Sequence, residues 1–345
     1  MNQLKYIFSF FNDDNFLHPF LTPIKLKGNT ILKDRIFPAP MEGILEPAFC
    51  KVLRKRKLVH SWITPFFRVT TGVPNLSTMK RFLKAFECDK VPVIVQLMGN
   101  NIELLAKTSL FIKENFPIVG INLNFACPSK VVCSKNAGGA LLKSPTFISD
   151  ILSSIEEVCP DISLSIKIRM GFEMPDEIIH ISKALENNKL DFVFLHHRTI
   201  VENYKKVPGR LERFKMARQA FHSTPIFLSG DIFSIDDATE LGNANVGDGM
   251  VIARGLIKTP WLIDDIREYF NHGAIKENQD NRPLEFFCDM LELAVENNVN
   301  WNKNYYAEIA RYLFGVKSEG FETYKKNHNN SPEEIYSCFR SKLNN

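Results

Sequence analysis

The chain has 345 residues, of which 45% are hydrophobic and 24% charged, with a formal net charge of +4. This composition is typical of a globular protein with one large domain and a small one, and it excludes a membrane-spanning chain because no apolar run is long enough to cross a bilayer. The N-terminus lacks a basic segment followed by a small-residue cleavage site, so we expect a cytoplasmic location.

The seven cysteines are spread along the chain without the paired spacing of a zinc site. Cys127 and Cys133 lie six residues apart, and the other five are scattered. An odd, scattered set is typical of reduced thiols in an intracellular protein. We therefore expect neither disulfides nor a metal site.

Residues 1–34 form an N-terminal lead and a predicted hairpin. The lead is rich in aromatic residues, and two short alternating runs follow it on either side of Gly28-Asn29. Alternating runs that flank a glycine-containing turn predict a β-hairpin. Such a hairpin could plug the bottom of the barrel that the next segment predicts.

Between residues 35 and 270, short β-rich runs alternate with helical patterns. The strand candidates are 35–39, 61–64, 92–97, 118–124, 163–169, 191–196, 225–229 and 249–253. The helical patterns between them include 102–115, 145–158, 176–188 and 211–221. Eight alternating units predict an α/β fold, the TIM (β/α)8 barrel, in which the chemistry lies at the C-terminal ends of the strands.

Polar residues stand at or just beyond the ends of these predicted strands: Gln96, Asn124, Lys167, Arg169, His196, Arg198, Gly230, Asp231 and Arg254. Each alone has an ordinary explanation, because polar residues begin where buried strands end. Together they indicate a shared binding site at the mouth of the barrel.

Residues 121–145 are typical of a reactive loop. Asn124 and then the Cys127-Pro128 pair follow an apolar run, and Gly138-Gly139 would let a ligand approach the backbone closely. A thiol at the C-terminal end of a buried strand is presented to whatever lies above the sheet. The alternative is that Cys127 is a small buried hydrophobe, which is the commoner fate of a free cysteine.

Two loops suggest a phosphate site. Ser229-Gly230-Asp231 follows the seventh predicted strand, and Ala253-Arg254-Gly255 follows the eighth. Barrels commonly bind phosphate at these two positions through backbone N–H groups. A flavin mononucleotide (FMN) would fit, with its ring over the barrel mouth, although the fold alone does not distinguish FMN from a sugar phosphate.

After Trp261 the β/α alternation stops. Helical patterns at 262–270, 284–297, 305–319 and 332–343 predict a helical appendage, and we place a domain boundary near residue 271. Its aromatic residues could stack on bases, but at helical spacing such residues more often form a core. They are Trp301, Tyr305, Tyr306, Tyr312 and Phe314. The basic run 54–57 is likewise either an RNA contact or a solvated helix end.

Several of these motifs resemble, in order and spacing, those of the tRNA-dihydrouridine synthases, a family of flavin enzymes. The similar segments are 39–43, 96–97, 124–128, 138–142, 167–169, 196–199, 230–232, 254–255 and 260–261. Glu42 after Ala-Pro-Met, residues 66–69, and the Pro-Ser-Lys that follows Cys127 look most like bacterial subgroup C. That subgroup modifies position 16 of the tRNA D-loop.

The resemblance implies an FMN-binding TIM barrel over 35–270 and a helical tRNA-binding domain over 271–345. It implies that NADPH reduces the FMN, that the flavin passes a hydride to C6 of a uridine, and that Cys127 protonates C5. It implies that tRNA is the partner, through its D-loop, and that the protein is a monomer without a metal.

The same resemblance assigns roles to single residues. Those implied to contact the flavin ring are Pro40, Met41, Glu42, Gln96, Lys167 and His196. Those implied to hold the phosphate end are Ser229, Gly230, Asp231, Ala253 and Arg254. Those implied to contact the substrate are Arg68, Asn124, Arg198 and Tyr204.

This chain departs from the family pattern at several positions. The family usually has Asp at Asn122, Gly at Ala126, Asn at Cys133, Gly at His197, Asn at Ser229 and Gly at Ala253. In the tail, Glu308 and Ala310 replace the subgroup's basic residues on an RNA-facing helix. A serine at position 229 can still bond a phosphate or ribityl group.

Two alternative functions remain open from the sequence. One is an FMN barrel of the ene reductase or dihydroorotate dehydrogenase type, which acts on a small molecule and does not account for the helical tail. The other is a non-catalytic tRNA-binding or chaperone protein, with the departures at Asn122 and Glu308 as marks of lost activity. A colourless protein that binds tRNA would favour the second alternative.

Overall fold

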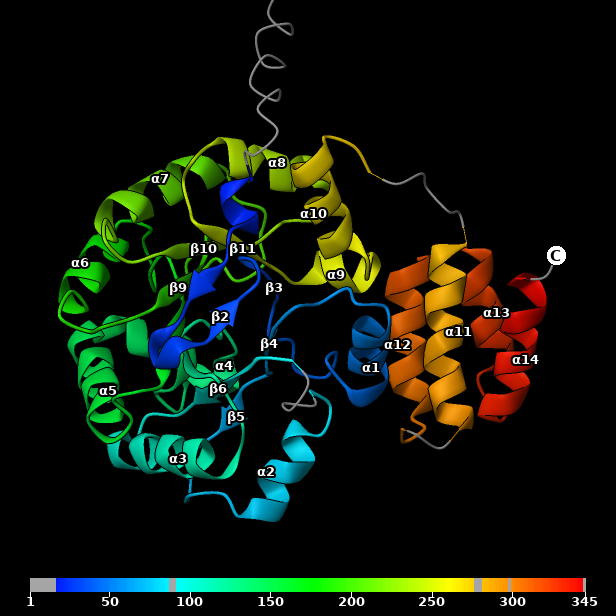
Figure 1. Ribbon diagram of the computed structural model, residues 1–345, viewed down its shortest axis with the longest axis horizontal. Coiled ribbons are helices and arrows are strands. Elements are labelled where there is room, and N and C mark those ends of the chain that lie inside the picture. Colours follow the sequence, from blue (N-terminus) through cyan, green and yellow to red (C-terminus); the bar gives the residue numbers. More distant parts are fainter. Residues whose placement is uncertain (1–16, 87–90, 276–280, 297–298, 344–345) are drawn as a thin grey trace, which may run out of the picture.

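The computed structural model describes residues 17–86, 91–275, 281–296 and 299–343 as a barrel with a bundle of helices at its side (Figure 1). Of the aromatic lead, residues 6–20, the part 6–16 lies outside the described residues. None of the helices in the described ranges is long and apolar enough to cross a membrane.

The barrel is a parallel sheet whose strands follow one another in the order β3-β11-β10-β9-β8-β7-β6-β4. Its strands are β3 (Ile36–Pro38), β4 (Trp62–Ile63), β6 (Val93–Met98), β7 (Gly120–Asn124), β8 (Ser163–Arg169), β9 (Phe192–His196), β10 (Ile226–Ser229) and β11 (Gly249–Ile252). Each lies within one of the eight predicted runs or extends it by one residue. A further short strand, β5 (Phe67–Arg68), pairs with β6 and was not predicted. The TIM barrel prediction is confirmed.

Helices connect the strands and surround the sheet (Figure 1). They are α1 (Pro47–Lys55), α2 (Leu76–Leu83), α3 (Ile102–Asn115), α4 (Lys130–Cys133), α5 (Pro145–Val158), α6 (Glu177–Ala184), α7 (Arg210–Ala220), α8 (Ile235–Asn243), α9 (Arg254–Lys258) and α10 (Leu262–His272). The bounds of α3 and α5 are those predicted. Helix α6 ends earlier than predicted, and the Asn188 amide beyond it donates to Ser149 O and Ser153 Oγ of α5.

The predicted hairpin forms and closes the N-terminal end of the barrel. Its strands, β1 (Ile24–Lys25) and β2 (Ile31–Leu32), pair antiparallel around a short 3-10 turn, η3 (Lys27–Asn29). Gly28 has φ 81°, and a Cβ there would lie 2.6 Å from the backbone oxygen of Asp161, just before β8. The Lys27 N–H donates to Asp191, just before β9. The hairpin is therefore anchored where the strands begin.

Aromatic side chains fill the barrel interior above the hairpin. Phe37, Phe192, Phe194 and Phe227 are fully buried, with ring centroids of neighbouring pairs 4.9 to 6.1 Å apart. The apolar side chains of the hairpin belong to the same buried cluster. Because this lower half of the barrel is packed, polar chemistry is confined to the C-terminal ends of the strands.

A bundle follows α10, with helices α11 (Arg282–Val295), α12 (Lys303–Phe314), α13 (Glu319–Asn327) and α14 (Pro332–Leu343). The predicted helix 305–319 is wrong at its end, and α13 was not predicted. Helix α12 stops at Gly315, whose φ of 87° does not continue a helix. Ser318 then caps α13 by accepting the Phe321 N–H on its side chain.

The aromatic residues of the bundle form its core, as their helical spacing indicates. Phe287 lies at the centre, with the rings of Tyr306, Phe314, Tyr324 and Phe339 between 5.0 and 6.2 Å from its own. Ala310 is also fully buried in this core. The expectation that position 310 faces RNA is therefore wrong.

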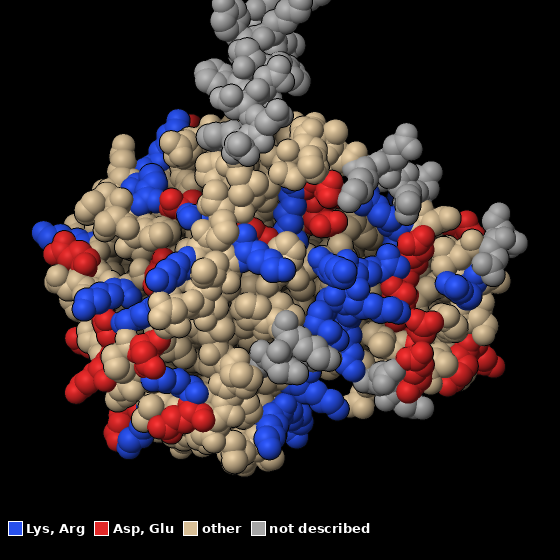
Figure 2. Space-filling view, in the orientation of Figure 1, with Lys and Arg blue, Asp and Glu red and all other residues tan. Residues whose placement is uncertain are grey.

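The basic run 54–57 meets the bundle. Arg56 bonds to Asp289 at 2.6 Å and Glu285 at 3.3 Å, and Lys55 bonds to Glu292 at 3.3 Å, all on α11. Figure 2 shows Lys and Arg side chains over α1 beside acidic side chains of the bundle. The run covers the last turn of α1 and the two residues after it, where the chain leads back to the start of β4. Lys55 and Arg56 therefore join the barrel to the bundle at the end of the barrel away from the mouth.

Candidate active site

A chain of buried hydrogen bonds crosses three strands beneath the barrel mouth. Gln96 Nε2 of β6 donates to Asn122 Oδ1 of β7 at 2.7 Å, and Asn122 Nδ2 donates to Ser165 Oγ of β8 at 2.9 Å. Asn124 Nδ2 donates to Gln96 Oε1 at 2.8 Å. Because both ends of the Gln96 and Asn122 amides are engaged, their orientations are fixed.

Asn124 connects this chain of hydrogen bonds to the reactive loop. Its Oδ1 accepts the backbone N–H groups of Ala126 at 3.0 Å and Cys127 at 3.1 Å. The side chain of Gln96 is fully buried and holds Asn124, and its expected contact with a cofactor stays a prediction. Gln96 is therefore a positioning residue for the loop that carries Cys127.

The loop presents Cys127 at the end of β7. Cys127 is only partly buried, whereas Cys50, Cys159 and Cys288 are buried. Its carbonyl oxygen accepts the Gly139 N–H at 3.1 Å and the Cys133 thiol at 3.6 Å. Gly138 has φ 56°, and a Cβ there would lie 3.1 Å from the Cys127 Cβ. Glycine thus lets the chain fold back over the cysteine, and the alternative of a fully buried Cys127 does not hold.

Lys167 stands beside Asn124 in the register of β7 and β8. Burial, and next the repulsion from Arg169, lowers the pKa of Lys167 from 10.5 to about 8. Since the amine is still mostly protonated at neutral pH, it places a positive charge at the barrel mouth. A cation in this environment stabilises an anion more strongly than it would in water.

Arg169 is a site residue to which the sequence assigned no role. Its Nε donates to Ala126 O at 3.0 Å, and its Nη1 donates to Thr199 O at 2.8 Å and to Asn203 O at 2.7 Å. Its guanidinium lies 5.6 Å from the ring centroid of Tyr204. Arg169 therefore ties the cysteine loop to the loop after β9. Its position at a strand end, two residues after Lys167, was the available signal.

His196 ends β9 close to this group. Its Nδ1 accepts the backbone N–H of Arg198 at 3.2 Å, so the neutral ring carries its proton on Nε2. Burial, then the charges of Arg169 and Lys167, lowers the pKa of His196 well below its usual value. The ring is therefore neutral at physiological pH and offers an N–H group next to Gly230, where a Cβ would lie 3.0 Å from Nε2.

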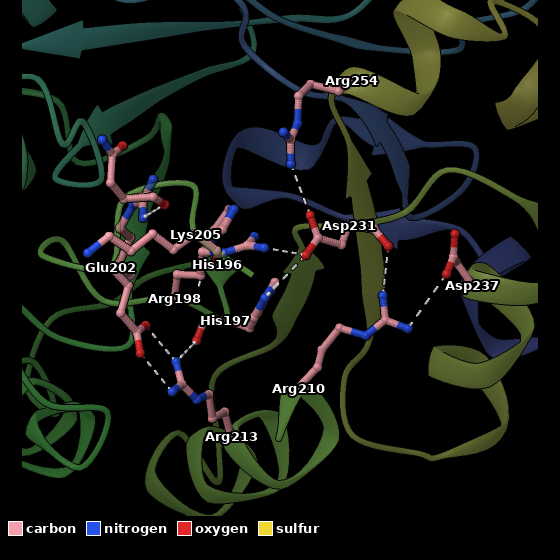
Figure 3. Close-up of polar contacts among 12 residues, drawn as sticks. His196, His197, Arg198, Glu202, Lys205, Arg210, Arg213, Asp231, Asp237 and Arg254 are labelled. Carbon is pink, nitrogen blue, oxygen red and sulfur yellow. Dashed lines mark hydrogen bonds and ion pairs between the residues drawn. The ribbon is translucent and has the colours of Figure 1, made fainter. Parts of the chain in front are cut away.

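Asp231, in the loop after β10, is the centre of a cluster of cations (Figure 3). Its carboxylate accepts Arg198 Nη2 at 2.5 Å and Arg254 Nη2 at 2.9 Å, and its backbone oxygen accepts Arg210 Nη1 at 2.7 Å. Burial raises the pKa of Asp231, but the bond from Arg198 and the charges of Arg198, His197 and Arg254 together outweigh it, so the net pKa is lowered. The side chain of Arg198 is buried beside Asp231, and its expected contact with the substrate stays a prediction.

The remaining predicted site residues lie on the rim of the mouth. Pro40 and Met41 are half-buried after β3, and Glu42 is exposed there, with Oε2 3.6 Å from Nη2 of Arg68. Tyr204 is 60% exposed beside the mouth. Ser229 is the last residue of β10, and Ala253 follows the last residue of β11. The pairing of these two strands brings them together.

The described residues fit an FMN. Lys167 supplies a cation where the polar edge of the ring would lie. At the phosphate end, Gly230 has φ 108°, and a Cβ on Gly255 would lie 2.1 Å from Ile232 O, so the two loops meet only because position 255 is glycine. The backbones of the two loops are thereby brought together, and backbone N–H groups are the usual ligands of a phosphate at this place in a barrel. The described part of the chain contains no cluster of three His, Cys, Asp or Glu side chains that could hold a metal.

Comparisons with known proteins give a consistent result. The sequence model of the dihydrouridine synthase (Dus) family matches residues 37–335. A tRNA-dihydrouridine(16) synthase of Neisseria meningitidis serogroup A is 26% identical over 298 residues, which covers 84% of this chain and 87% of that protein. One of Pseudomonas putida is 28% identical over 265 residues, which covers 75% and 79%.

Solved structures share the fold at low identity. The structure of TcOYE with pHBA has a TM-score of 0.56 at 12% identity and covers 76% of this chain and 95% of that chain. Histamine dehydrogenase from Rhizobium sp. 4-9 has a TM-score of 0.57 at 14% identity and covers 79% and 51%. These likenesses concern the fold alone.

Proposed function

This chain belongs to the dihydrouridine synthase family, and on that premise we propose that it reduces a uridine of tRNA to 5,6-dihydrouridine, with bound FMN and with NADPH as the reductant. The observation that carries the proposal is the placement of Cys127 at the barrel mouth. The Oδ1 of Asn124 accepts the backbone N–H of Cys127 at 3.1 Å, and Lys167 stands beside Asn124 on the next strand.

FMN, when bound, takes reducing equivalents from NADPH and supplies the hydride that goes to C6 of uracil. Lys167 holds its proton at the mouth and stabilises negative charge on the polar edge of the ring. Pro40, Met41 and Glu42 would hold the ring from the loop after β3. His196 would offer its Nε2–H as a donor at the same mouth.

The proton for C5 comes from Cys127. Hydride arrival at C6 leaves an enolate with charge on O4 and C5, and the thiol has only to deliver one proton to C5. A general acid of this kind contributes about 10²- to 10⁴-fold to the rate. Gln96 and Asn122 act through Asn124, because they set its orientation and thus the position of the thiol.

The phosphate end of the cofactor belongs to the loops after β10 and β11. Backbone N–H groups of Ser229, Gly230, Asp231 and Ala253 would hold it, with Arg254 at the rim. The Asp231 carboxylate is not itself a phosphate ligand, because both of its oxygens are bonded to arginines, Arg198 and Arg254. Its role is to hold Arg198 and Arg254 in place.

The substrate enters as a flipped nucleotide. A base inside folded RNA cannot reach the mouth of a barrel, so the D-loop must be splayed and the uridine extruded. Asn124, Arg169 and Tyr204 would contact the substrate next to Cys127, together with Arg198 and with Arg68 on β5. Position 16 is the target we propose, because the relatives named above carry that position in their names. We further propose a monomer that acts in the cytoplasm and that contacts tRNA also through its bundle.

The departures from the family pattern do not dismantle the site. Asn122 bonds Gln96 and Ser165 and so completes the amide chain. Glu308 lies on the exposed side of α12, 3.9 Å from Arg311, and Ala310 is in the core. The departures at Asn122 and Glu308 therefore do not support the alternative of a non-catalytic protein.

The experiment that tests this function is to map dihydrouridine in tRNA from cells with and without this gene. We expect one D-loop position, 16 in the family numbering of tRNA, to lose its dihydrouridine when the gene is absent and to regain it on complementation. Identical dihydrouridine maps in the two strains would contradict the proposal.

A further inference from the structure

A second polar pocket lies outside the ring of strands, between α7 and α8. It has a volume of about 540 Å³, and its walls include His197, Arg210 at the start of α7 and Asp237 near the start of α8. Successive residues of a strand point to opposite sides of a sheet. His196 faces the mouth, whereas the ring of His197 lies 6.0 Å from that of Phe214 on α7. The pocket is therefore on the outer flank of the site described above.

Two buried side chains in its wall have polar atoms without a hydrogen-bond partner among the described residues. They are Nη1 of Arg198 and Nδ1 of His197, in side chains that are 2% and 1% exposed. Arg198 uses its other two nitrogens, Nε to Lys205 O at 2.6 Å and Nη2 to Asp231 at 2.5 Å. An unpaired guanidinium nitrogen is costly to bury, so its free N–H groups indicate a missing acceptor.

The charge and the rim of the pocket indicate which acceptor fits. Arg198, Lys206, Arg210 and Arg254 line it against Asp231 and Asp237, and with Glu240, which bonds to Arg210, the group has a net charge of +1. At the rim, the Arg254 guanidinium lies 5.6 Å from the ring of Tyr204 and 5.3 Å from that of Phe233. These rings are 60% and 40% exposed. A basic pocket bordered by exposed aromatic rings is typical of surfaces that bind single-stranded nucleic acid.

We propose that this outer pocket binds a backbone phosphate of the RNA strand next to the target uridine. The inference rests on the proposed function, and it adds a strand-positioning site to it. The pocket adjoins the loop backbones that we assign to the cofactor phosphate, and Asp231 and Arg254 are shared between the two sites. A phosphate held by Arg198 and Lys206 would fix the strand while the neighbouring base turns into the mouth. His197, where the family usually has glycine, is part of this wall.

The test uses the FMN-loaded protein and an unmodified tRNA transcript. Lys206→Glu reverses a charge at the exposed rim of the pocket. Its matched control is Lys189→Glu, which makes the same change at an exposed position before β9, at the opposite end of the barrel. Dissociation constants are measured over a range of salt concentrations. We expect Lys206→Glu to weaken tRNA binding about tenfold more than the control and to reduce the slope of log K against log salt by about 1.

A second variant, Arg198→Lys, keeps the charge but removes the fork that reaches both Asp231 and the pocket. We expect it to raise KM for tRNA, with FMN content measured in the same preparation and all rates expressed per bound FMN. If Arg198→Lys does not fold, Lys206→Glu decides alone.

Other results would overturn the inference. Binding of Lys206→Glu equal to that of the Lys189→Glu control would show that the pocket does not contact RNA. A loss of FMN, or a raised KM for NADPH without RNA, would assign the pocket to the cofactor or the reductant. A wild-type protein that neither binds nor modifies tRNA would instead refute the proposed function itself.

Discussion

The side chain of Asn124 accepts the backbone N–H of Cys127 at 3.1 Å, and its own amide donates to Gln96 at 2.8 Å. The position of the thiol therefore depends on side chains of two neighbouring strands as well as on its own loop. Because the strands form the rigid part of the barrel, the proton donor is held in place before a substrate arrives. Pre-positioning of this kind saves the cost of ordering the group during the reaction.

Replacement of Cys127 should separate proton transfer from every earlier step. Cys127→Ala should keep its bound FMN, oxidise NADPH and bind tRNA, because none of these steps uses the thiol. Its rate of dihydrouridine formation should fall by about 10²- to 10⁴-fold. Single-turnover assays with pre-reduced enzyme measure this step directly. Dihydrouridine formation at the normal rate would show that another group donates the proton.

Cys133→Ala is the matched control. Cys133 donates only a weak bond, at 3.6 Å, to the carbonyl oxygen of Cys127. Burial, with a smaller effect of Cys127, raises the pKa of Cys133, so it is a protonated thiol at neutral pH. We expect its loss to leave the turnover rate within a factor of a few. An indispensable Cys133 would contradict the assignment of Cys127.

The amide chain should tolerate aspartate at position 122 better than an apolar residue. In Asn122→Asp, one carboxylate oxygen still accepts from Gln96, and the hydroxyl of Ser165 can turn to donate to the other. Asn122→Leu removes the acceptor of Gln96 Nε2 and the donor to Ser165 Oγ, although Ser165 still has Ile121 O as an acceptor at 3.4 Å. It should cost about 2 to 6 kcal/mol in the free energy of unfolding, from two buried polar groups at about 1–3 kcal/mol each. Urea unfolding of the two variants gives the comparison. Greater stability of Asn122→Leu than of Asn122→Asp would contradict the chain of bonds described here.

Lys167 should give the reaction a basic limb in its pH dependence. The pKa of its amine is lowered to about 8, so the charge at the mouth is present below that pH and lost above it. An anionic group bound nearby raises this pKa, so the rate of flavin reduction by NADPH should fall at or somewhat above pH 8. Stopped-flow measurements between pH 6 and 10 test this.

Lys167→Arg is the control for this limb, because an arginine keeps its charge throughout the range. We expect a slower reaction, since the guanidinium is larger than the amine, but no fall in rate near pH 8 to 9. An unchanged limb in Lys167→Arg would mean that another group titrates there.

Arg56 should stabilise the contact between the barrel and the bundle. Its side chain is 28% exposed and bonds to Asp289 and Glu285 in a network that also includes Lys55. Arg56→Ala should cost about 1 kcal/mol in the free energy of unfolding, because the ion pairs are partly buried. The cost should be smaller at high salt, because salt screens these pairs. Lys107→Ala, which breaks a more exposed pair with Glu103 within α3, should cost less. Equal effects of the two substitutions in urea unfolding would contradict a joining role for Arg56.

Much of the fold could be predicted from the chain because buried parallel strands and their following helices leave strong local patterns. The runs that became β8 and β9, and the helix α5, match the predicted ranges closely. The end of α12 was missed since helical spacing continues through Gly315, and only its positive φ of 87° shows the break. A break of this kind depends on the packing of the two helices that follow.

The site could be predicted residue by residue but not in its connections. Spacing placed Asn124, Lys167 and His196 at strand ends, and each is there. Whether an arginine points to the substrate or to a carboxylate depends on partners far away in sequence. Arg198, which bonds to Asp231, is an example. The same holds for Gln96, whose partners Asn122 and Asn124 are on the neighbouring strand.

The central claim is that this protein reduces a uridine in tRNA, and reconstitution tests it most directly. Purified wild-type protein is loaded with FMN, supplied with NADPH and an unmodified tRNA transcript, and the product is mapped for dihydrouridine. We predict one dihydrouridine in the D-loop, formed only when both FMN and NADPH are present. A protein that binds FMN, oxidises NADPH and binds the transcript, yet leaves every uridine unreduced, would contradict the account.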